Sequence, residues 1–314
     1  MKTLSLISVS FISMFFLTGC NIVPIEYNDS MLDGPVIRDT SFTDHTFLLS
    51  SHPELDTFNR EKPVIICAHG YTATTFEWQE FRDYAQQDAR AYTSLVALGG
   101  HGRSVEEFKV STWEQWQAPV MEEFDALVSK GFKKISLAGS STGGALLIEY
   151  LSRNAFDSKA VKPQEFYFID AIVVPSSKLL HIVPLIGPIL GNSPVEHESE
   201  LEDKYWYTNR PTPTLDELNE LIELVRRKLE KGITLPYGSH AKCYKSKIDN
   251  SADPVSSILI YKGLKQSDGN RIDVEVVDSD LHVFTRLAGR KVVSEQDSTL
   301  QKAVFKEMID RVVE

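Results

Sequence analysis

The sequence predicts an α/β fold: a doubly wound, mostly parallel sheet with a helical cap inserted late in the chain. Short apolar runs alternate with amphipathic segments at helical spacing along most of the chain. The alternation stops once, over about residues 175–240, and then resumes. The short apolar runs are typical of strands buried on both faces, so we expect helices on both sides of the sheet.

Length and charge restrict the class of protein. The 314 residues can hold one large α/β domain after an N-terminal segment. Lys and Arg number 33 against 44 Asp and Glu, a net charge of -11. Nucleic-acid binding needs a basic surface, so no nucleic-acid partner is expected.

The N-terminus has the pattern of a secretory signal. Lys2 is the only basic residue before an apolar run over residues 4–17, and Leu17-Thr18-Gly19-Cys20 follows. The run is too short for a comfortable permanent membrane span. Its end resembles the bacterial lipobox, in which the cysteine is lipidated and becomes the new N-terminus. The alternative is a plain signal peptide with an incidental cysteine.

We therefore expect a lipoprotein signal peptide over residues 1–19, a polar tether over 20–40 and the folded domain over 41–314. Acyl chains on Cys20 would hold the protein on a membrane without a spanning helix. The expected location is the bacterial cell envelope, at the outer membrane or the periplasmic face of the inner membrane.

The elements before the cap follow from apolar periodicity. Strands are expected over residues 41–50, 63–71, 92–98, 133–139 and 166–174, and helices over 74–89, 112–129 and 144–151. Between the fourth strand and its helix stands Gly139-Ser140-Ser141-Thr142-Gly143, a G-x-S-x-G pattern. A serine at such a strand-to-helix turn presents its hydroxyl above the sheet. The helix N-terminus behind it favours negative charge on a substrate oxygen. Ser141 is thus a candidate nucleophile; the alternative is an ordinary glycine-serine turn.

The cap contains a proline-rich apolar run over residues 179–190 and an aromatic cluster, Tyr205-Trp206-Tyr207. A helix is expected over residues 214–231, with Thr214 and Glu217 forming a capping box. An insertion of this length is typical of a lid or subdomain. Its apolar run either packs on itself or lines an acyl pocket.

After the cap the alternation returns. Strands are expected over residues 241–248 and 271–277, and helices over 255–264 and 294–313. Cys67 and Cys243 lie in strand-like segments and are expected to be core residues without a disulfide. Neither HExxH nor CxxC spacing occurs, so no metal site and no cofactor are expected.

Functional residues in doubly wound sheets gather beyond the carboxyl ends of the strands. The polar residues at such positions are His69, His101, Ser141, Asp170, Asp253 and His282. A serine needs a base to take its proton, and the base needs an orienting carboxylate. Ser141, Asp253 and His282 follow one another in the order serine, acid, histidine.

The acid is the least determined member of this set. His282 is the only histidine after Asp253, so the base has no rival in that chain order. Asp170 and Asp249 are alternatives to Asp253 as the acid. Asp253-Pro254 also fits a helix cap followed by proline at the first helical position.

Together these motifs resemble those of α/β-hydrolases, and within them of bacterial carboxylesterases and monoacylglycerol-lipase-like enzymes. The matching pieces are His69-Gly70-Tyr71-Thr72, Gly100-His101-Gly102-Arg103-Ser104, the Ser141 turn, Asp253-Pro254-Val255 and His282. They extend from about residue 63 to the C-terminus. The chain departs from the families by carrying Ser140 and Thr142 beside the serine. This leaves open whether Ser140 or Ser141 attacks, although the glycine spacing favours Ser141.

The resemblance implies a serine hydrolase that cleaves small-molecule or lipid-like carboxylic esters through an acyl-enzyme. It further implies that the backbone N–H groups of Tyr71 and Thr142 form the oxyanion hole, with His69 and His101 structural. An amidase or peptidase on the same fold, or an inactive hydrolase-fold binding lipoprotein, is the alternative. Glu196, Glu198, Glu200 and Glu202 would hold peptide termini in the former and otherwise form a solvated face.

Overall fold

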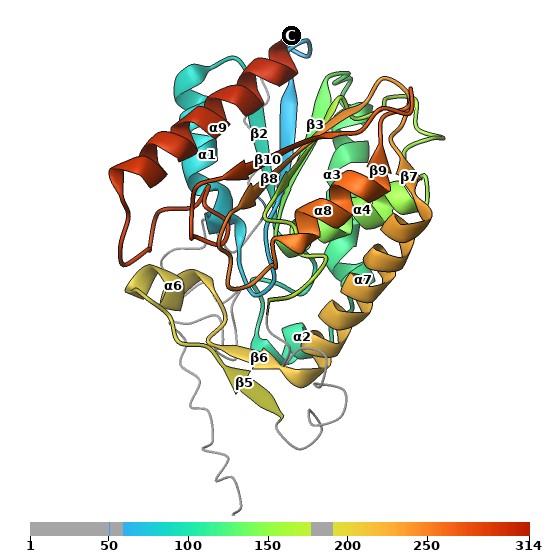
Figure 1. The fold of residues 1–314 in the computed structure, drawn as a ribbon. Coiled ribbons are helices and arrows are strands. Elements are labelled where there is room, and N and C mark those ends of the chain that lie inside the picture. Colours follow the sequence, from blue (N-terminus) through green and yellow to red (C-terminus); the bar gives the residue numbers. More distant parts are fainter. Residues whose placement is uncertain (1–49, 51–58, 177–190) are drawn as a thin grey trace, which may run out of the picture.

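The computed structural model describes residue 50, residues 59–176 and residues 191–314 (Figure 1). The predicted signal peptide, Cys20 and the tether lie outside these residues, as do the predicted apolar run over 179–190 and all but the last residue of the strand over 41–50. Within the described ranges, no helix is long and apolar enough to cross a membrane.

Six parallel strands form the central sheet, as the sequence predicts (Figure 1). In spatial order they are β10 (Asp273–Val277), β8 (His240–Ser246), β4 (Glu165–Ile169), β3 (Ile135–Ser140), β1 (Val64–Ala68) and β2 (Tyr92–Val96). The predicted strand over 166–174 is shorter than expected, because the chain leaves the sheet after Ile169.

The sheet is doubly wound, and β1 shows why its sequence is apolar throughout. Val64, Ile66 and Ala68 point into one buried cluster, and Ile65 and Cys67 point into the other. Alternate residues of a strand face opposite sides, so a strand covered on both sides needs apolar residues at every position. The prediction that Cys67 and Cys243 are core residues is confirmed, since both are buried.

Helices cover both faces (Figure 1). One face carries α1 (Gln79–Asp88), which follows the short helix η1 (Thr75–Trp78), together with α9 (Glu295–Val313). The other face carries α3 (Trp113–Ser129), α4 (Thr142–Ser152), α7 (Thr212–Lys231) and α8 (Val255–Gly263). A five-residue helix that was not predicted, α2 (Val105–Lys109), begins at a capping box on Ser104.

The described part of the inserted segment begins with a hairpin-like pair, β5 (Asn192–Pro194) and β6 (Asn209–Pro211), which flank α6 (Glu200–Tyr205). These elements lie together at one end of the sheet (Figure 1). The long helix α7 then packs against α4 and α8, so it belongs to the helical layer on the sheet. After it, β7 (Ile233–Thr234) pairs with β9 (Leu264–Lys265).

The predicted capping box of the long helix is wrong. The helix begins two residues earlier, at Thr212, with Pro211 as its cap. The hydroxyl of Thr214 donates to the Pro211 carbonyl, and the Glu217 carboxylate accepts from the Trp113 N–H. Thr214 thus bonds back to the residue that precedes the helix, and a partner distant in the chain takes Glu217 away from the helix terminus.

Aromatic residues join the inserted segment to the sheet domain. Tyr207 stacks on Phe108 with ring centroids 4.4 Å apart, and its hydroxyl donates to the Arg103 carbonyl at 2.7 Å. The Tyr207 N–H donates to the Thr72 carbonyl at 3.1 Å. The aromatic cluster therefore fixes the cap to the loop after β1.

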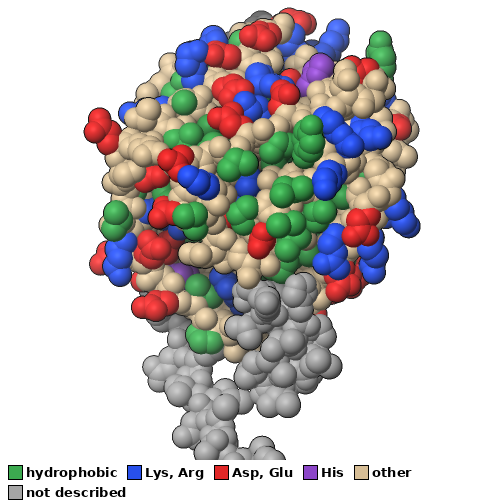
Figure 2. Space-filling view, viewed as in Figure 1, with side chains coloured by type: hydrophobic (Ala, Val, Ile, Leu, Met, Phe, Trp, Pro, Cys, Tyr) green, Lys and Arg blue, Asp and Glu red, His purple; other side chains and the backbone are tan. Residues whose placement is uncertain are grey.

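The surface is mainly polar and charged, with some hydrophobic side chains gathered on the face shown in Figure 2. Part of this apolar surface belongs to α8, where Val255, Ile258 and Tyr261 are exposed.

Candidate active site

Ser141 stands at a sharp turn between β3 and α4, as predicted. Its φ and ψ are 48° and -115°, a backbone conformation uncommon for a residue with a side chain. The turn can close only because the residues two positions before and two positions after Ser141 are glycines. A Cβ on Gly139 would lie 2.6 Å from the Gly143 backbone, and one on Gly143 would lie 2.3 Å from the Ala68 carbonyl oxygen.

The two candidate serines face different surroundings. The Ser140 hydroxyl is buried; it donates to the Glu77 carboxylate and lies 3.3 Å from the Ala68 carbonyl oxygen. Ser141 instead lines a cavity that His282 also lines. The geometry therefore favours Ser141 as the nucleophile, in agreement with the glycine spacing.

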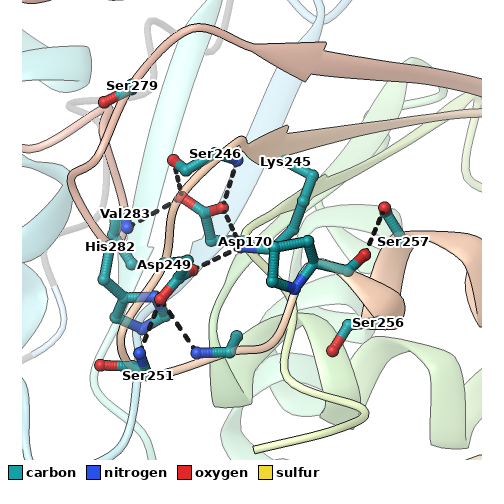
Figure 3. Close-up of polar contacts among 12 residues, drawn as sticks. Asp170, Lys245, Ser246, Asp249, Ser251, Ser256, Ser257, Ser279, His282 and Val283 are labelled. Atoms are coloured by element: carbon teal, nitrogen blue, oxygen red, sulfur yellow. Dashed lines mark hydrogen bonds and ion pairs between the residues drawn. The ribbon is translucent and has the colours of Figure 1, made fainter. Parts of the chain in front are cut away.

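The predicted pairing of Asp253 with His282 is wrong. His282 Nδ1 lies 2.8 Å from a carboxylate oxygen of Asp249, one of the two alternatives (Figure 3). The Asp253 carboxylate accepts from the Val255 N–H at 2.8 Å, at the start of α8. Asp253 thus serves the helix start that its neighbour Pro254 also indicated.

A buried ion-pair network supports this pair (Figure 3). The Lys245 ammonium binds the Asp249 carboxylate and lies 2.7 Å from the Asp170 carboxylate. Asp170 also accepts from the Ser246 N–H at 2.7 Å and from the Val283 N–H at 2.9 Å. Asp170, the third candidate acid, therefore holds the residue next to His282 and not His282 itself.

The Asp249 carboxylate is held in its ionised form. Burial raises its pKa, but the hydrogen bond and charge of His282 and the charge of Lys245 outweigh burial, so the pKa lies below its ordinary value. Its other oxygen accepts from the Ser251 and Ala252 N–H groups at 2.8 and 2.9 Å. A carboxylate fixed in this way can orient an imidazole and stabilise its protonated form.

One group of potential metal ligands occurs among the described residues: Asp170, Asp249 and His282, whose nearest ligand atoms lie within 4.8 Å of one another. The Lys245 ammonium already binds both carboxylates, and His282 Nδ1 bonds to Asp249. These contacts assign the group to an ion-pair network centred on Lys245.

The loop after β1 lies against Ser141. A Cβ on Gly70 would lie 3.2 Å from the Ser141 Cβ, and the Gly70 N–H donates to Glu77 at 2.8 Å. His69 is buried and bridges the loop to the end of β2: its Nε2 accepts from the Leu98 N–H at 3.1 Å, so Nδ1 carries the proton donated to the Gly70 carbonyl. The supporting role predicted for His69 agrees with these contacts.

The predicted oxyanion-hole residues lie beside the nucleophile. Tyr71 and Thr142 line the same cavity as Ser141. Thr142 is the first residue of α4, where a helix N–H has no intrahelical partner. The side chain of Tyr71 points elsewhere, since its hydroxyl pairs with that of Thr214 at 2.6 Å. The position of both residues is compatible with two N–H groups directed at an oxygen near Ser141.

Backbone strain concentrates around this cavity. Among the described non-glycine residues with positive φ, Thr72, Ser141, Asp170 and Val283 belong to the site or its supports. Such conformations cost free energy and persist where the surroundings fix them, often at functional sites.

The cavity has a volume of about 350 Å³. Its walls combine the candidate catalytic residues with apolar side chains, several of them from the cap region, and with charged ones. The apolar lining includes Ile172, Trp206, Leu215 and Leu218, and the charged lining includes Glu77, Arg210, Arg286 and Arg290.

Sequence reasoning missed several of these residues. Lys245 lies inside a strand and Glu77 inside a helical segment, where a charged residue is usually solvent-exposed. Arg210, Arg286 and Arg290 lie in irregular or cap segments without a recognisable motif. The one available signal was a charged residue in an otherwise apolar strand, which applies to Lys245.

No family model matches the chain. It is similar to a thermostable monoacylglycerol lipase of Bacillus sp. (strain H-257), with 27% identity over 210 residues that cover 65% of this chain and 77% of that protein. It is also similar to a carboxylesterase of Bacillus subtilis (strain 168), with 26% identity over 180 residues that cover 57% and 70%.

Solved structures agree at the level of the fold. A structure described with LipS and LipT, two metagenome-derived lipolytic enzymes, superposes with a TM-score of 0.64 at 18% identity, covering 80% of this chain and 94% of that one. With its six-stranded parallel sheet flanked by helices, the chain has the α/β-hydrolase fold.

Proposed function

We propose that the protein is a serine hydrolase that cleaves carboxylic esters through an acyl-enzyme. The observation that carries the proposal is that Ser141, at its strained turn, lines one cavity with His282, whose Nδ1 is bonded to the buried Asp249. The similarity to a monoacylglycerol lipase and a carboxylesterase supports an ester as the bond that is cleaved.

In the proposed mechanism, Nε2 of His282 takes the proton of Ser141 as the hydroxyl oxygen attacks the ester carbonyl. Asp249 keeps the other ring nitrogen protonated and stabilises the imidazolium. The N–H groups of Tyr71 and Thr142 stabilise the oxyanion. His282 then protonates the departing alcohol, and a water activated by His282 hydrolyses the acyl-enzyme.

The first experiment is hydrolysis of chromogenic acyl esters from short to long chains by protein beginning at Asn21, beside Ser141→Ala. We expect hydrolysis by the unaltered protein and its loss in the variant. The best chain length would measure the space that the apolar wall provides. Inertness of both proteins, together with failure of a serine-directed phosphonate to label them, would favour a binding lipoprotein. Labelling without ester turnover would favour an amide substrate.

Two neighbouring aspartates test the assignment of the acid. Asp249→Asn should lower kcat by about 10⁴-fold, because the amide cannot hold the imidazole tautomer. Asp253→Asn is the matched control: asparagine caps helices nearly as well as aspartate, so we expect kcat within about twofold and little change in stability. Steady-state kinetics of both variants decide, and a larger loss in Asp253→Asn would contradict the assignment.

We also propose that Cys20 is lipidated and holds the protein on a membrane of the bacterial cell envelope. Leu17-Thr18-Gly19-Cys20 supports this reading. In a bacterial host that processes lipoproteins, mass spectrometry should find an acylated Cys20 at the new N-terminus, and the protein should sediment with membranes. Cys20→Ala should abolish acylation and cleavage at this site. Acyl-free cleavage of the unaltered chain would instead indicate a plain signal peptide.

A further inference from the structure

Three arginines line the cavity that holds Ser141 and His282: Arg210, Arg286 and Arg290. Arg210 lies in β6 of the cap, and the other two follow His282 in the chain. This is a local concentration of positive charge in an acidic protein, whose net charge is -11. The overall charge of the chain therefore does not explain it.

Only one of the three has a carboxylate partner in the described part of the chain. Arg286 forms a buried ion pair with Glu202 at 2.8 Å, and its guanidinium lies 4.6 Å from the centre of the Trp206 ring. Arg290 donates to the backbone carbonyl of His282. Arg210 pairs with Ser193 through the strand backbone, but its guanidinium has no hydrogen bond or ion pair with the described residues.

The guanidiniums also retain unused donors in buried positions. The Nε atoms of Arg210, Arg286 and Arg290 are all buried without a hydrogen-bond partner among the described residues. Glu77, the acidic residue in the cavity wall, is already engaged by the Gly70 N–H and the Ser140 hydroxyl. The acidic side chains of the site thus leave these three Nε–H donors without a hydrogen-bond acceptor among the described residues.

Removal of a guanidinium from water is unfavourable unless an anion or hydrogen-bond acceptor compensates it. Burial and the like charge of Arg286 lower the pKa of Arg290 to about 10, against the attraction of Glu202, Glu198 and Glu77, so this side chain is still protonated at neutral pH. A planar guanidinium matches the two oxygens of a carboxylate or phosphate. An anionic group in the cavity would supply the hydrogen-bond acceptors that the protein's own carboxylates do not.

We propose that the substrate is an ester whose acyl or alcohol part carries a carboxylate or phosphate, bound by Arg210 and Arg290 beside the reacting centre. This inference rests on the proposed ester hydrolase activity and narrows its substrate class. The apolar side chains Leu215 and Leu218 would contact the hydrocarbon part of the same molecule. The predicted substrate is therefore amphiphilic and anionic.

Two matched pairs of esters test the proposal. For the acyl part, the mono-para-nitrophenyl ester of suberic acid is compared with para-nitrophenyl octanoate, which replaces the terminal carboxylate by a methyl group. For the alcohol part, the octanoyl ester of glycerol phosphate is compared with the octanoyl ester of glycerol. The readout is the ratio of kcat/KM within each pair, charged over neutral, at low and high salt.

We expect one charged ester to exceed its neutral partner by about tenfold or more, since a charge-assisted hydrogen bond contributes that much to recognition. The ratio should fall with added salt. Arg210→Gln should lower the ratio about fivefold to tenfold. Arg290→Gln is the second variant, in case the cap does not tolerate the first, and thermal unfolding verifies that each is folded.

Arg227→Gln is the matched control. Arg227 is exposed on α7, and its ion pair with the Glu223 carboxylate is long, at 3.9 Å. This substitution should leave both ratios unchanged. Two results would overturn the proposal while leaving the esterase in place. One is that neutral esters are cleaved as well as charged ones in both pairs. The other is that neither Arg210→Gln nor Arg290→Gln changes the ratio. Failure of all four esters, with Ser141→Ala no different, would instead remove the proposed function itself.

Discussion

At the scale of single residues, the Lys245 ammonium has an unusual environment for a lysine. Its side chain is 1% exposed, and the carboxylates of Asp170 and Asp249 that flank it are both 0% exposed. A buried ion pair does not by itself imply high stability, because desolvation offsets the attraction. Its consequence is geometric: it fixes the carboxylate that orients His282 and the one that holds Val283.

Lys245→Met should therefore destabilise the protein by about 3–5 kcal/mol, because two buried carboxylates would lose their shared cation. Urea unfolding measures the change. Lys247→Met is the control two residues away: its pairing with Asp278 at 3.3 Å is solvent-exposed, so we expect a change below about 1 kcal/mol. Equal effects of the two substitutions would show that the network around Lys245 has no special importance.

The sequence alone could not decide which carboxylate pairs with His282. Asp249 and Asp253 lie in one loop, and the chain order serine, acid, histidine fits both. The choice depends on where the loop turns. Asp249 is held at the end of β8 by the Ser251 and Ala252 N–H groups, whereas Asp253 lies at the start of α8. The meeting of Ser141 and His282 in one cavity could be predicted because their motifs allow few alternatives.

At the scale of elements, the cap is attached to the segment that follows His282. Glu202 of α6 forms a buried ion pair with Arg286, and its other oxygen accepts from the Glu198 N–H at 2.8 Å. The expected solvated acidic face is therefore incorrect for Glu202, although Glu196, Glu198 and Glu200 are exposed. The contact connects a cap helix to the segment that carries two of the cavity's arginines.

Glu202→Gln should destabilise the protein by about 1–3 kcal/mol, because Arg286 would lose its charged acceptor in a buried position. Glu200→Gln is the matched control on the same helix, where the side chain is exposed. Thermal unfolding and proteolysis of the cap measure the effect. If Glu202→Gln were as stable and as resistant to protease as Glu200→Gln, this ion pair would not be important for the cap.

The elements that the sequence predicted well are those that packing on the sheet defines. The strand β1 and the helices α1 and α9 carry an apolar pattern that the two buried clusters require. The start of α7 was mispredicted because Thr214 and Glu217 bond to Pro211 and Trp113 instead of forming a capping box. Trp113 is far from Glu217 in the chain, and a distant partner of this kind leaves no local signal.

At the scale of the whole molecule, two histidines in the core between β1, β2 and α3 couple its stability to pH. His69 and His101 are fully buried, with ring centroids 5.3 Å apart. Burial lowers the pKa of His69 and lowers that of His101 well below its ordinary value, the latter assisted by the charge of His69. Both rings are therefore neutral in the folded protein under conditions where an unfolded chain would protonate them.

The sign of the pH effect follows from proton uptake. An unfolded histidine has a pKa of about 6.5, so below that pH the unfolded chain binds protons that the folded chain excludes. The free energy of unfolding should accordingly decrease as the pH falls below about 6.5. Each excluded proton contributes a slope of up to about 1.4 kcal/mol per pH unit. The lowered pKa of Asp249 acts in a separate window, removing stability only below about pH 4.

His101→Phe isolates this contribution. His101 packs among aromatic rings, with Phe108 at 4.7 Å and Trp116 at 5.4 Å between centroids, and its Nε2 has no hydrogen-bond partner among the described residues. Phenylalanine suits these surroundings and cannot be protonated. Urea unfolding between about pH 5 and 6.5 should show a slope smaller than that of the unaltered protein by up to about 1.4 kcal/mol per pH unit. His240→Gln, at an exposed site, is the control. If His101→Phe kept the full slope, the pH dependence would have to come from other groups, and His101 would not be the neutral core residue inferred from its burial.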